Sequence, residues 1–171
     1  MKYLIKIIII FFTLSNVSYA ADKIAFVDID FIINDSELGK KLNKNFNENI
    51  KKEDGRLKKK EEDLKSQEKK ILNQKNVLSE DELNKLLIEL RKEITNFKNE
   101  RISINKKLRD QKIKETNSLL SSLNNILANY AEENSISLII QKKNIVIGKS
   151  ELDITKDVLN IFNSEVKSIS N

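Results

Sequence analysis

The feature that most constrains this chain is a long interior stretch without helix breakers. Residues 40–133 contain no proline and a single glycine, Gly55, and they are rich in Lys, Glu, Leu, Asn and Ile. Most of these residue types favour helices. The stretch therefore predicts long helices, and it leaves strands to the two ends of the chain.

Apolar residues along this stretch recur at the spacing of a coiled-coil seam. In the first half the intervals are four and then seven residues, through Leu42, Phe46, Ile50, Leu57, Leu64 and Ile71. The companion heptad positions there are polar, as at Glu53, Lys60 and Gln67. In the second half intervals of four and three run through Leu83, Leu87, Leu90, Ile94, Phe97, Ile104, Leu108, Leu119, Leu123, Ile126 and Tyr130. This second stripe is interrupted by Arg101, Gln111 and Glu115.

A helix-start signal separates the two halves. Ser79 followed by Glu82 is a capping box, and Glu80 and Asp81 place acid on the first turn. Residues 37–133 therefore predict a protruding antiparallel helical hairpin with its tip at about residues 73–79. At 1.5 Å per residue the second helix would be about 80 Å long and the first about 55 Å, so residues 115–133 must pack against another part of the protein.

The two ends of the chain carry strand-like apolar runs. Ile24–Val27 predicts one strand, and Leu138–Ile140 and Ile145–Ile147, the latter ending at Gly148, predict two more. A last helix is expected after an N-cap at Asp153 or Thr155, with an apolar face of Ile154, Val158, Ile161, Phe162 and Val166. The predicted fold is α+β and mostly helical: residues 21–36 and 134–171 form a small β-rich body that carries the hairpin arm.

This body is too small to be stable alone, because one core seldom suffices below about 70 residues. A three-stranded sheet also leaves open edges, which proteins cover or pair. Both arguments predict a homo-oligomer joined through the sheets, without giving the number of subunits. The candidate interface residues are Ile24, Phe26, Val27, Leu138, Ile140 and Val146.

The first twenty residues resemble a secretory signal peptide. Lys2 and Lys6 are basic, residues 7–14 are apolar but too short to span a bilayer, and Ser18 and Ala20 fit an A-x-A-like cleavage site. We expect cleavage after Ala20 and an exported mature chain; the alternative is an uncleaved membrane anchor. Export also argues against a nucleic-acid partner for the basic arm.

The composition argues against an enzyme. The sequence has no Cys and no His, which removes the usual nucleophile–base pairs and most transition-metal sites. The three glycines, Gly39, Gly55 and Gly148, form no phosphate-binding loop. We therefore expect no catalytic residues, no metal site and no cofactor.

Charge is divided between arm and body. Residues 40–115 carry 23 basic and 15 acidic residues, a net charge of +8, whereas the rest of residues 21–171 carries 6 basic and 11 acidic residues, a net charge of −5. Within the arm, Gly55 is either a tolerated helix-weakening residue or a hinge that lets the arm bend.

Three motifs show a resemblance to a known family. "ADKIAFVD" at residues 21–28, "SELGKKL" at 36–42 and "SLIIQKKNIVIGKSELDITKDVL" at 137–159 resemble the OmpH/Skp family of periplasmic chaperones; in the arm only pattern and length are similar. The resemblance implies a homotrimer with a central barrel-like body, helical arms around a cavity, and an ATP-independent holdase for unfolded outer-membrane proteins. Some members are proposed to bind lipopolysaccharide through basic arm residues, so a contact with this or another anionic lipid is a further expectation.

The residues suggest how such an arm would hold a client. Basic side chains attract acidic clients over about a Debye length, with Lys106, Lys107, Arg109 and Lys112 as candidates. Apolar residues off the seam then contact the client, and the candidates are Leu78, Leu86, Ile88, Ile102 and Ile113. The alternative function is a periplasmic coiled-coil scaffold or spacer that binds one folded envelope partner.

Overall fold

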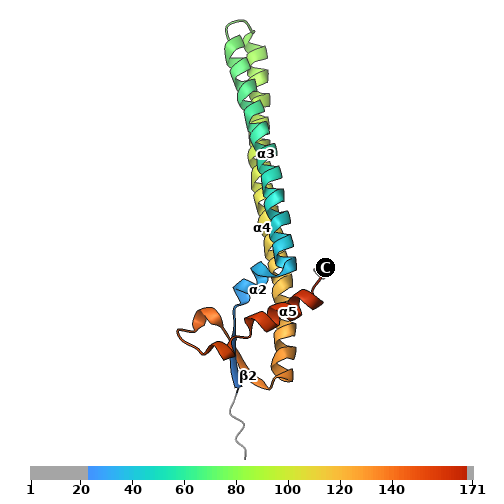
Figure 1. Cartoon of the computed structure of the whole chain (residues 1–171). Helices are drawn as coiled ribbons and strands as arrows, with labels where there is room; N and C mark the ends of the chain where they lie inside the picture. The colour runs from blue at the N-terminus through green and yellow to red at the C-terminus, as the bar shows by residue number, and fades with distance from the viewer. Residues whose placement is uncertain (1–22, 169–171) are drawn as a thin grey trace, which may run out of the picture.

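The computed structural model describes residues 23–168, so the predicted signal peptide lies outside the described residues. The elements run in the order β1 (Lys23–Val27), α2 (Ile29–Asp35), α3 (Glu37–Gln74), α4 (Glu80–Glu133), β2 (Ile136–Gln141), two 3-10 turns (Lys142–Asn144 and Ser150–Leu152) and α5 (Thr155–Glu165). Figure 1 shows α3 and α4 side by side as one long arm that projects from a small body. No helix among residues 23–168 combines the length and apolar character that crossing a bilayer requires.

The predicted hairpin is confirmed, including the residue at which its second helix begins. The Ser79 hydroxyl accepts a hydrogen bond from the Glu82 N–H (3.4 Å), and the Glu82 carboxylate accepts one from the Ser79 N–H (3.1 Å). This reciprocal pair satisfies two of the N–H groups that every helix start leaves without a partner. The tip is shorter than expected, because α3 continues to Gln74.

The body joins the two ends of the chain through a parallel strand pair. Ile24 pairs with Leu138 and Phe26 with Ile140. On the other side of β1, the Ile154 N–H donates to the Phe26 carbonyl oxygen at 3.0 Å. The end of β1 is therefore held between β2 and the start of α5.

The third predicted strand, Ile145–Ile147, is wrong. Its residues lie in the connection between the two 3-10 turns, and Val146 and Ile147 are almost fully exposed. Within the described chain no other strand pairs with this segment, since the sheet contains β1 and β2 alone. A strand needs a hydrogen-bonded neighbour, and here the position next to β1 is taken by the residues around Asp153.

Neither of the two residues expected as the N-cap of α5 takes that position: the N-cap is Ile154, whose side chain makes no capping hydrogen bond. The helix begins at Thr155, after Ile154, and the Asp153 carboxylate accepts the Thr155 N–H at 3.0 Å. The Thr155 hydroxyl donates to the same carboxylate and accepts the Asp28 N–H at 2.9 Å. This chain of hydrogen bonds fixes the end of β1 to the start of α5.

Helix α2 was not expected from the sequence, which placed residues 21–36 in a β-rich segment. The Asp28 side chain caps it by accepting the Phe31 N–H at 2.9 Å. Ser36 then ends α2 and begins α3: its N–H donates to the Ile32 carbonyl oxygen at 3.0 Å, and its buried hydroxyl accepts the Gly39 N–H at 3.1 Å. Ser36 therefore sets the direction in which the arm leaves the body.

The lower end of α4 supplies much of the body core. Its Leu119, Leu123 and Ile126 pack in one buried cluster with residues of β1, α2, β2 and α5, among them Ile32, Val158 and Phe162. The expectation that residues 115–133 pack outside the hairpin is confirmed.

Candidate functional surfaces

The upper arm, meaning the part between Gly55 and the tip, has a buried cluster of its own. Leu57, Leu64 and Ile71 of α3 and Leu90 and Phe97 of α4 form a second buried cluster, separate from the body core. At its lower edge, Glu100 of α4 accepts hydrogen bonds from Arg56 (2.5 Å) and Lys60 (2.6 Å) of α3. The hydrogen bond from Lys60 and then that from Arg56 lower the pKa of Glu100. These ion pairs cross-link the two helices just above Gly55.

Between the two buried clusters the arm has a waist, which we define as residues 43–54 of α3 and 105–115 of α4. No side chain in the waist is fully buried. Instead of pairing across the seam, Gln111 donates to Glu115 within α4 at 2.8 Å. The interruption of the seam at Gln111 and Glu115 thus coincides with a segment at the lower end of the arm that has no fully buried side chain.

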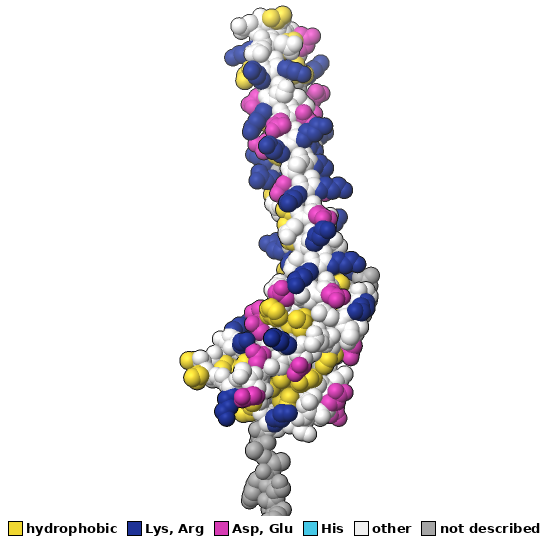
Figure 2. All heavy atoms as spheres, in the orientation of Figure 1, with side chains coloured by type: hydrophobic (Ala, Val, Ile, Leu, Met, Phe, Trp, Pro, Cys, Tyr) yellow, Lys and Arg dark blue, Asp and Glu magenta, His cyan; other side chains and the backbone are white. Residues whose placement is uncertain are grey.

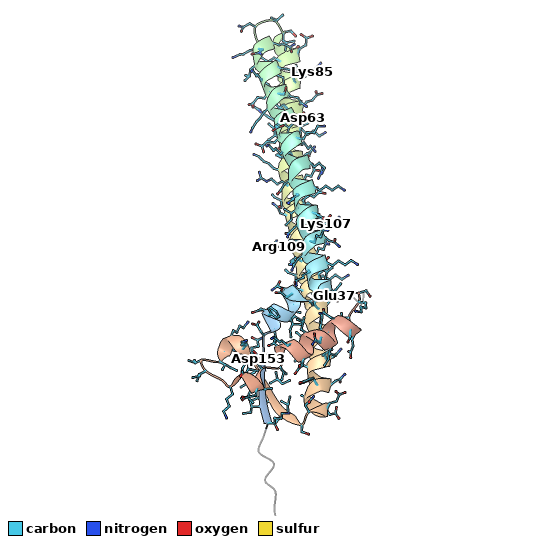
Figure 3. All side chains as sticks on the ribbon, in the orientation of Figure 1. Glu37, Asp63, Lys85, Lys107, Arg109 and Asp153 are labelled. Atoms are coloured by element: carbon cyan, nitrogen blue, oxygen red, sulfur yellow. The ribbon has the colours of Figure 1, made fainter. Side chains whose placement is uncertain are left out.

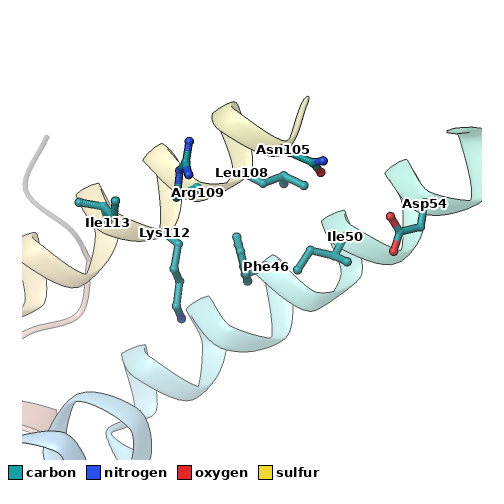
Figure 4. A pocket seen from close by; sticks show the side chains of 8 residues that line it. All are labelled: Phe46, Ile50, Asp54, Asn105, Leu108, Arg109, Lys112 and Ile113. Carbon is teal, nitrogen blue, oxygen red and sulfur yellow. The ribbon is translucent and has the colours of Figure 1, made fainter. Parts of the chain in front are cut away.

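One side of the waist is hollowed. Phe46 and Ile50 of α3 and Leu108 and Ile113 of α4 line a depression of about 420 Å³ together with Asp54, Asn105, Arg109 and Lys112 (Figure 4). Lys112 reaches across it to α3: its ammonium lies 5.3 Å from the centre of the Phe46 ring and donates to the Asn43 side chain. The sequence alone did not reveal this contact, although Lys112 follows the seam residue Leu108 by one helical turn.

The predicted basic residues do not form a single patch. Lys106 and Lys107 border one shallow hollow with Lys114, whereas Arg109 and Lys112 line the depression with Phe46. Lys107 and Arg109 are two residues apart and therefore lie on opposite sides of α4 (Figure 3). Lys112 is half-buried against α3, which leaves Lys106, Lys107 and Arg109 as the exposed members of the predicted set.

The predicted apolar contact residues are of two kinds. Ile88, Ile102 and Ile113 are exposed, with 64%, 66% and 52% of their surface accessible. Leu86 is half-buried and packs against the upper-arm cluster, so the prediction that it lies off the seam is wrong. Leu78 is half-buried at the tip, where the neighbouring Val77 and Leu72, which were not predicted, are exposed.

The body exposes part of its apolar surface. Of the six interface candidates, Ile24, Leu138 and Val146 are exposed and Ile140 is half-buried, whereas Phe26 and Val27 are buried within the same chain. Phe31 of α2, not predicted, is also exposed. Figure 2 shows hydrophobic side chains gathered on the visible face of the body, below an arm that carries many Lys and Arg side chains. Phe26 and Val27 therefore act as core residues here, and the remaining four stay candidates for contact with a partner.

No group of three acidic side chains among residues 23–168 is placed to hold a metal ion. Several acidic residues of the arm instead pair with bases, as Glu61 does with Lys65 at 2.7 Å.

Comparisons with known proteins agree with this architecture. Residues 23–162 match the model of the family described as outer membrane protein (OmpH-like). A comparison with curated protein sequences found no match. Among solved structures, a protein of Caulobacter crescentus CB15, proposed to be an OmpH-like outer membrane chaperone, superimposes with a TM-score of 0.81 at 14% identity, covering 89% of this chain and 90% of its own.

The structural match supports the fold, and the family match extends over strand, arm and last helix together. The chain therefore belongs to the OmpH-like family of outer membrane proteins.

Proposed function

We propose that this protein is a non-enzymatic, ATP-independent holdase of the periplasm that binds unfolded outer-membrane proteins and prevents their aggregation. The observation that carries the proposal is the combination, on one long arm, of a net positive charge with isoleucines that are more than half exposed and take no part in the seam. A plain spacer needs the seam residues, but it gains nothing from exposing Ile88, Ile102 and Ile113.

The unfolded state of an outer-membrane barrel suits such an arm. Its strands alternate apolar and polar side chains, so in water it exposes apolar segments that aggregate. Weak contacts at several places along an arm can hold such a chain and release it without a nucleotide, because each contact breaks independently.

The body supports a homo-oligomer, which we propose to be a trimer with the arms around a shared cavity. Ile24 and Leu138, neighbours across the β1–β2 pair, are both exposed, and the other edge of β2 has no strand partner among residues 23–168. A second copy that packs on this face would bury both side chains and pair the open edge.

A direct test is to dilute a urea-unfolded outer-membrane barrel protein into buffer with the mature chain and without ATP, and to follow light scattering. We expect the client to stay soluble and to be released when a membrane or detergent accepts it. Aggregation at the same rate as without the protein would exclude the holdase function and favour the scaffold alternative. Adding vesicles with and without anionic lipid, or lipopolysaccharide, to the protein alone tests the expected lipid contact.

A further inference from the structure

The two helices of the arm differ in what they expose. Along the shaft of α4 three large apolar side chains, Ile88, Ile102 and Ile113, are exposed. On α3 every large apolar side chain from Leu38 to Ile71 is buried or half-buried, and the first exposed one is Leu72, next to the tip. If exposed aliphatic side chains were placed on the arm by chance, we would expect them on both α3 and α4.

The three isoleucines lie on one face of α4. At about 100° per residue, the 14 residues from Ile88 to Ile102 fall about 40° short of four turns, and the 11 residues from Ile102 to Ile113 exceed three turns by about 20°. The buried seam residues Leu90 and Phe97 lie about 160–180° away from Ile88 on the same count. The isoleucines therefore occupy the face of α4 that points away from α3.

Cations alternate with the isoleucines along this outward face. Lys92, Lys106 and Arg109 are exposed and lie within about 60° of Ile88, and Asp110 is the acidic residue of the same sector between Ile88 and Ile113. The outward face of α3 has a different composition, with no large apolar residue and with acids among its lysines: Lys44, Glu48, Lys52, Gly55, Lys59, Glu62 and Ser66.

We propose that the outward face of α4 is the surface of the arm that holds the client, and that the outward face of α3 stays in solvent. The client segment that fits is an extended chain with apolar side chains and carboxylates, because its apolar groups meet the isoleucines and its acids meet Lys92, Lys106 and Arg109. The isoleucines are spaced by about 21 Å and 16 Å along the helix, so one segment contacts them separately and weakly. This inference rests on the proposed holdase function and adds which side of the arm performs it.

The lower end of the outward face opens into the hollow of the waist. Arg109 and Ile113 belong both to this face and to the depression floored by Phe46 and Ile50 (Figure 4). A client side chain that follows the face toward the body therefore reaches additional apolar surface beside Ile113.

Cross-linking distinguishes the two faces directly. The sequence contains no cysteine, so Asn99→Cys on the outward face of α4 and Ser66→Cys on the outward face of α3 each introduce a single thiol for a benzophenone label. Both positions are exposed. With an unfolded outer-membrane barrel protein bound, we expect the label at position 99 to cross-link to the client at least tenfold more than the label at position 66.

Two charge-matched variants test the role of the cations. Lys92→Gln, Lys106→Gln and Arg109→Gln together remove three positive charges from α4, and Lys44→Gln, Lys52→Gln and Lys59→Gln remove three from α3. At low salt the α4 variant should associate with the client several-fold more slowly than the α3 variant, and the difference should shrink at high salt. Ile88→Gln, Ile102→Gln and Ile113→Gln together should speed release at every salt concentration.

The outcomes separate this inference from the proposed function. If the protein keeps the client soluble but both labels cross-link equally, or both charge variants slow association equally, the assignment of the face is wrong and the holdase function stands. If no client is kept soluble and neither label cross-links, the holdase function fails, and the inference fails with it.

Discussion

The backbone of Gly39 lies against the carbonyl oxygen of Ile33, so closely that a β-carbon on residue 39 would be 1.9 Å from that oxygen. Ile33 belongs to α2 and Gly39 to the first turn of α3, and the buried Ser36 lies between them. The tight corner between body and arm therefore requires glycine for space.

Gly39→Ala should destabilise the protein, because the backbone of α2 or α3 must move to admit the methyl group. Strain of this kind typically costs about 1–3 kcal/mol. Urea unfolding at one fixed protein concentration measures the change in the free energy of unfolding.

Gly55→Ala is the matched control, because a β-carbon at Gly55 meets nothing within 4 Å. There alanine should stabilise helix α3 by about 0.5–1 kcal/mol. Equal effects of the two substitutions would contradict the explanation from close packing. The hinge hypothesis for Gly55 also predicts that Gly55→Ala narrows the range of client sizes held; α3 passes through Gly55 without interruption.

The cross-link at Glu100 should weaken in acid. The hydrogen bonds from Lys60 and Arg56 lower its pKa below the ordinary 4.5, so the ionised form is favoured in the folded arm. The stabilisation is therefore present above pH 4.5 and is lost as pH falls through the lowered pKa. NMR titration of the Glu100 carboxyl carbon gives this pKa directly. In the Glu100→Gln variant, the free energy of unfolding should decrease less between pH 4.5 and the lowered pKa of Glu100. Glu89, exposed on the same helix, serves as the site for a control glutamine.

The waist should open more readily than the helix on either side of it. Because it contains no fully buried side chain, we expect amides of residues 105–115 to exchange hydrogen faster than those near Phe97 or Leu123. Asn43→Leu together with Lys112→Leu replaces the polar contact across the hollow by an apolar pair beside Phe46, and it should slow that exchange severalfold. Lys114→Leu, on an exposed position of the same helix, should not. Uniform exchange along α4 would show that the waist is as rigid as the rest of the arm.

A charge on the open face of the body should disrupt the proposed trimer. Leu138 is 52% exposed on β2, next to Ile24, and Leu138→Lys would place an ammonium where a second copy is expected to pack. Light scattering at micromolar concentration should give three times the chain mass for the mature protein and a smaller mass for this variant. Leu72→Lys, at a position that is 60% exposed and near the arm tip, should leave the mass unchanged. A wild-type monomer or dimer would contradict the trimer.

The parts of the fold that follow from local pattern were predictable. The arm follows from its apolar periodicity, and the start of α4 follows from Ser79 and Glu82, because a capping box needs no distant partner. Tertiary contacts decided the parts that were missed. The run Ile145–Ile147 has strand composition but pairs with no strand among residues 23–168, and α2 depends on a corner at Ser36 and Gly39 that leaves no periodic signal in seven residues. Likewise, Leu86 lies one turn before the seam residue Leu90 on the same side of α4 and packs beside the seam, which a strict heptad count does not capture.

The parallel pairing of β1 with β2 has a consequence for the order of folding. Ile24 and Leu138, which are paired, are 114 positions apart, and bringing together the ends of so long a loop costs about 2 kcal/mol more than closing a ten-residue one. The contacts between α3 and α4 do not require β1 and β2 to pair. Once α3 and α4 have packed together, the ends of the chain are already close. We therefore expect the arm to form before the body. β1 is synthesised first, and it has no strand to pair with until β2, more than 100 residues later in the chain, has also been synthesised.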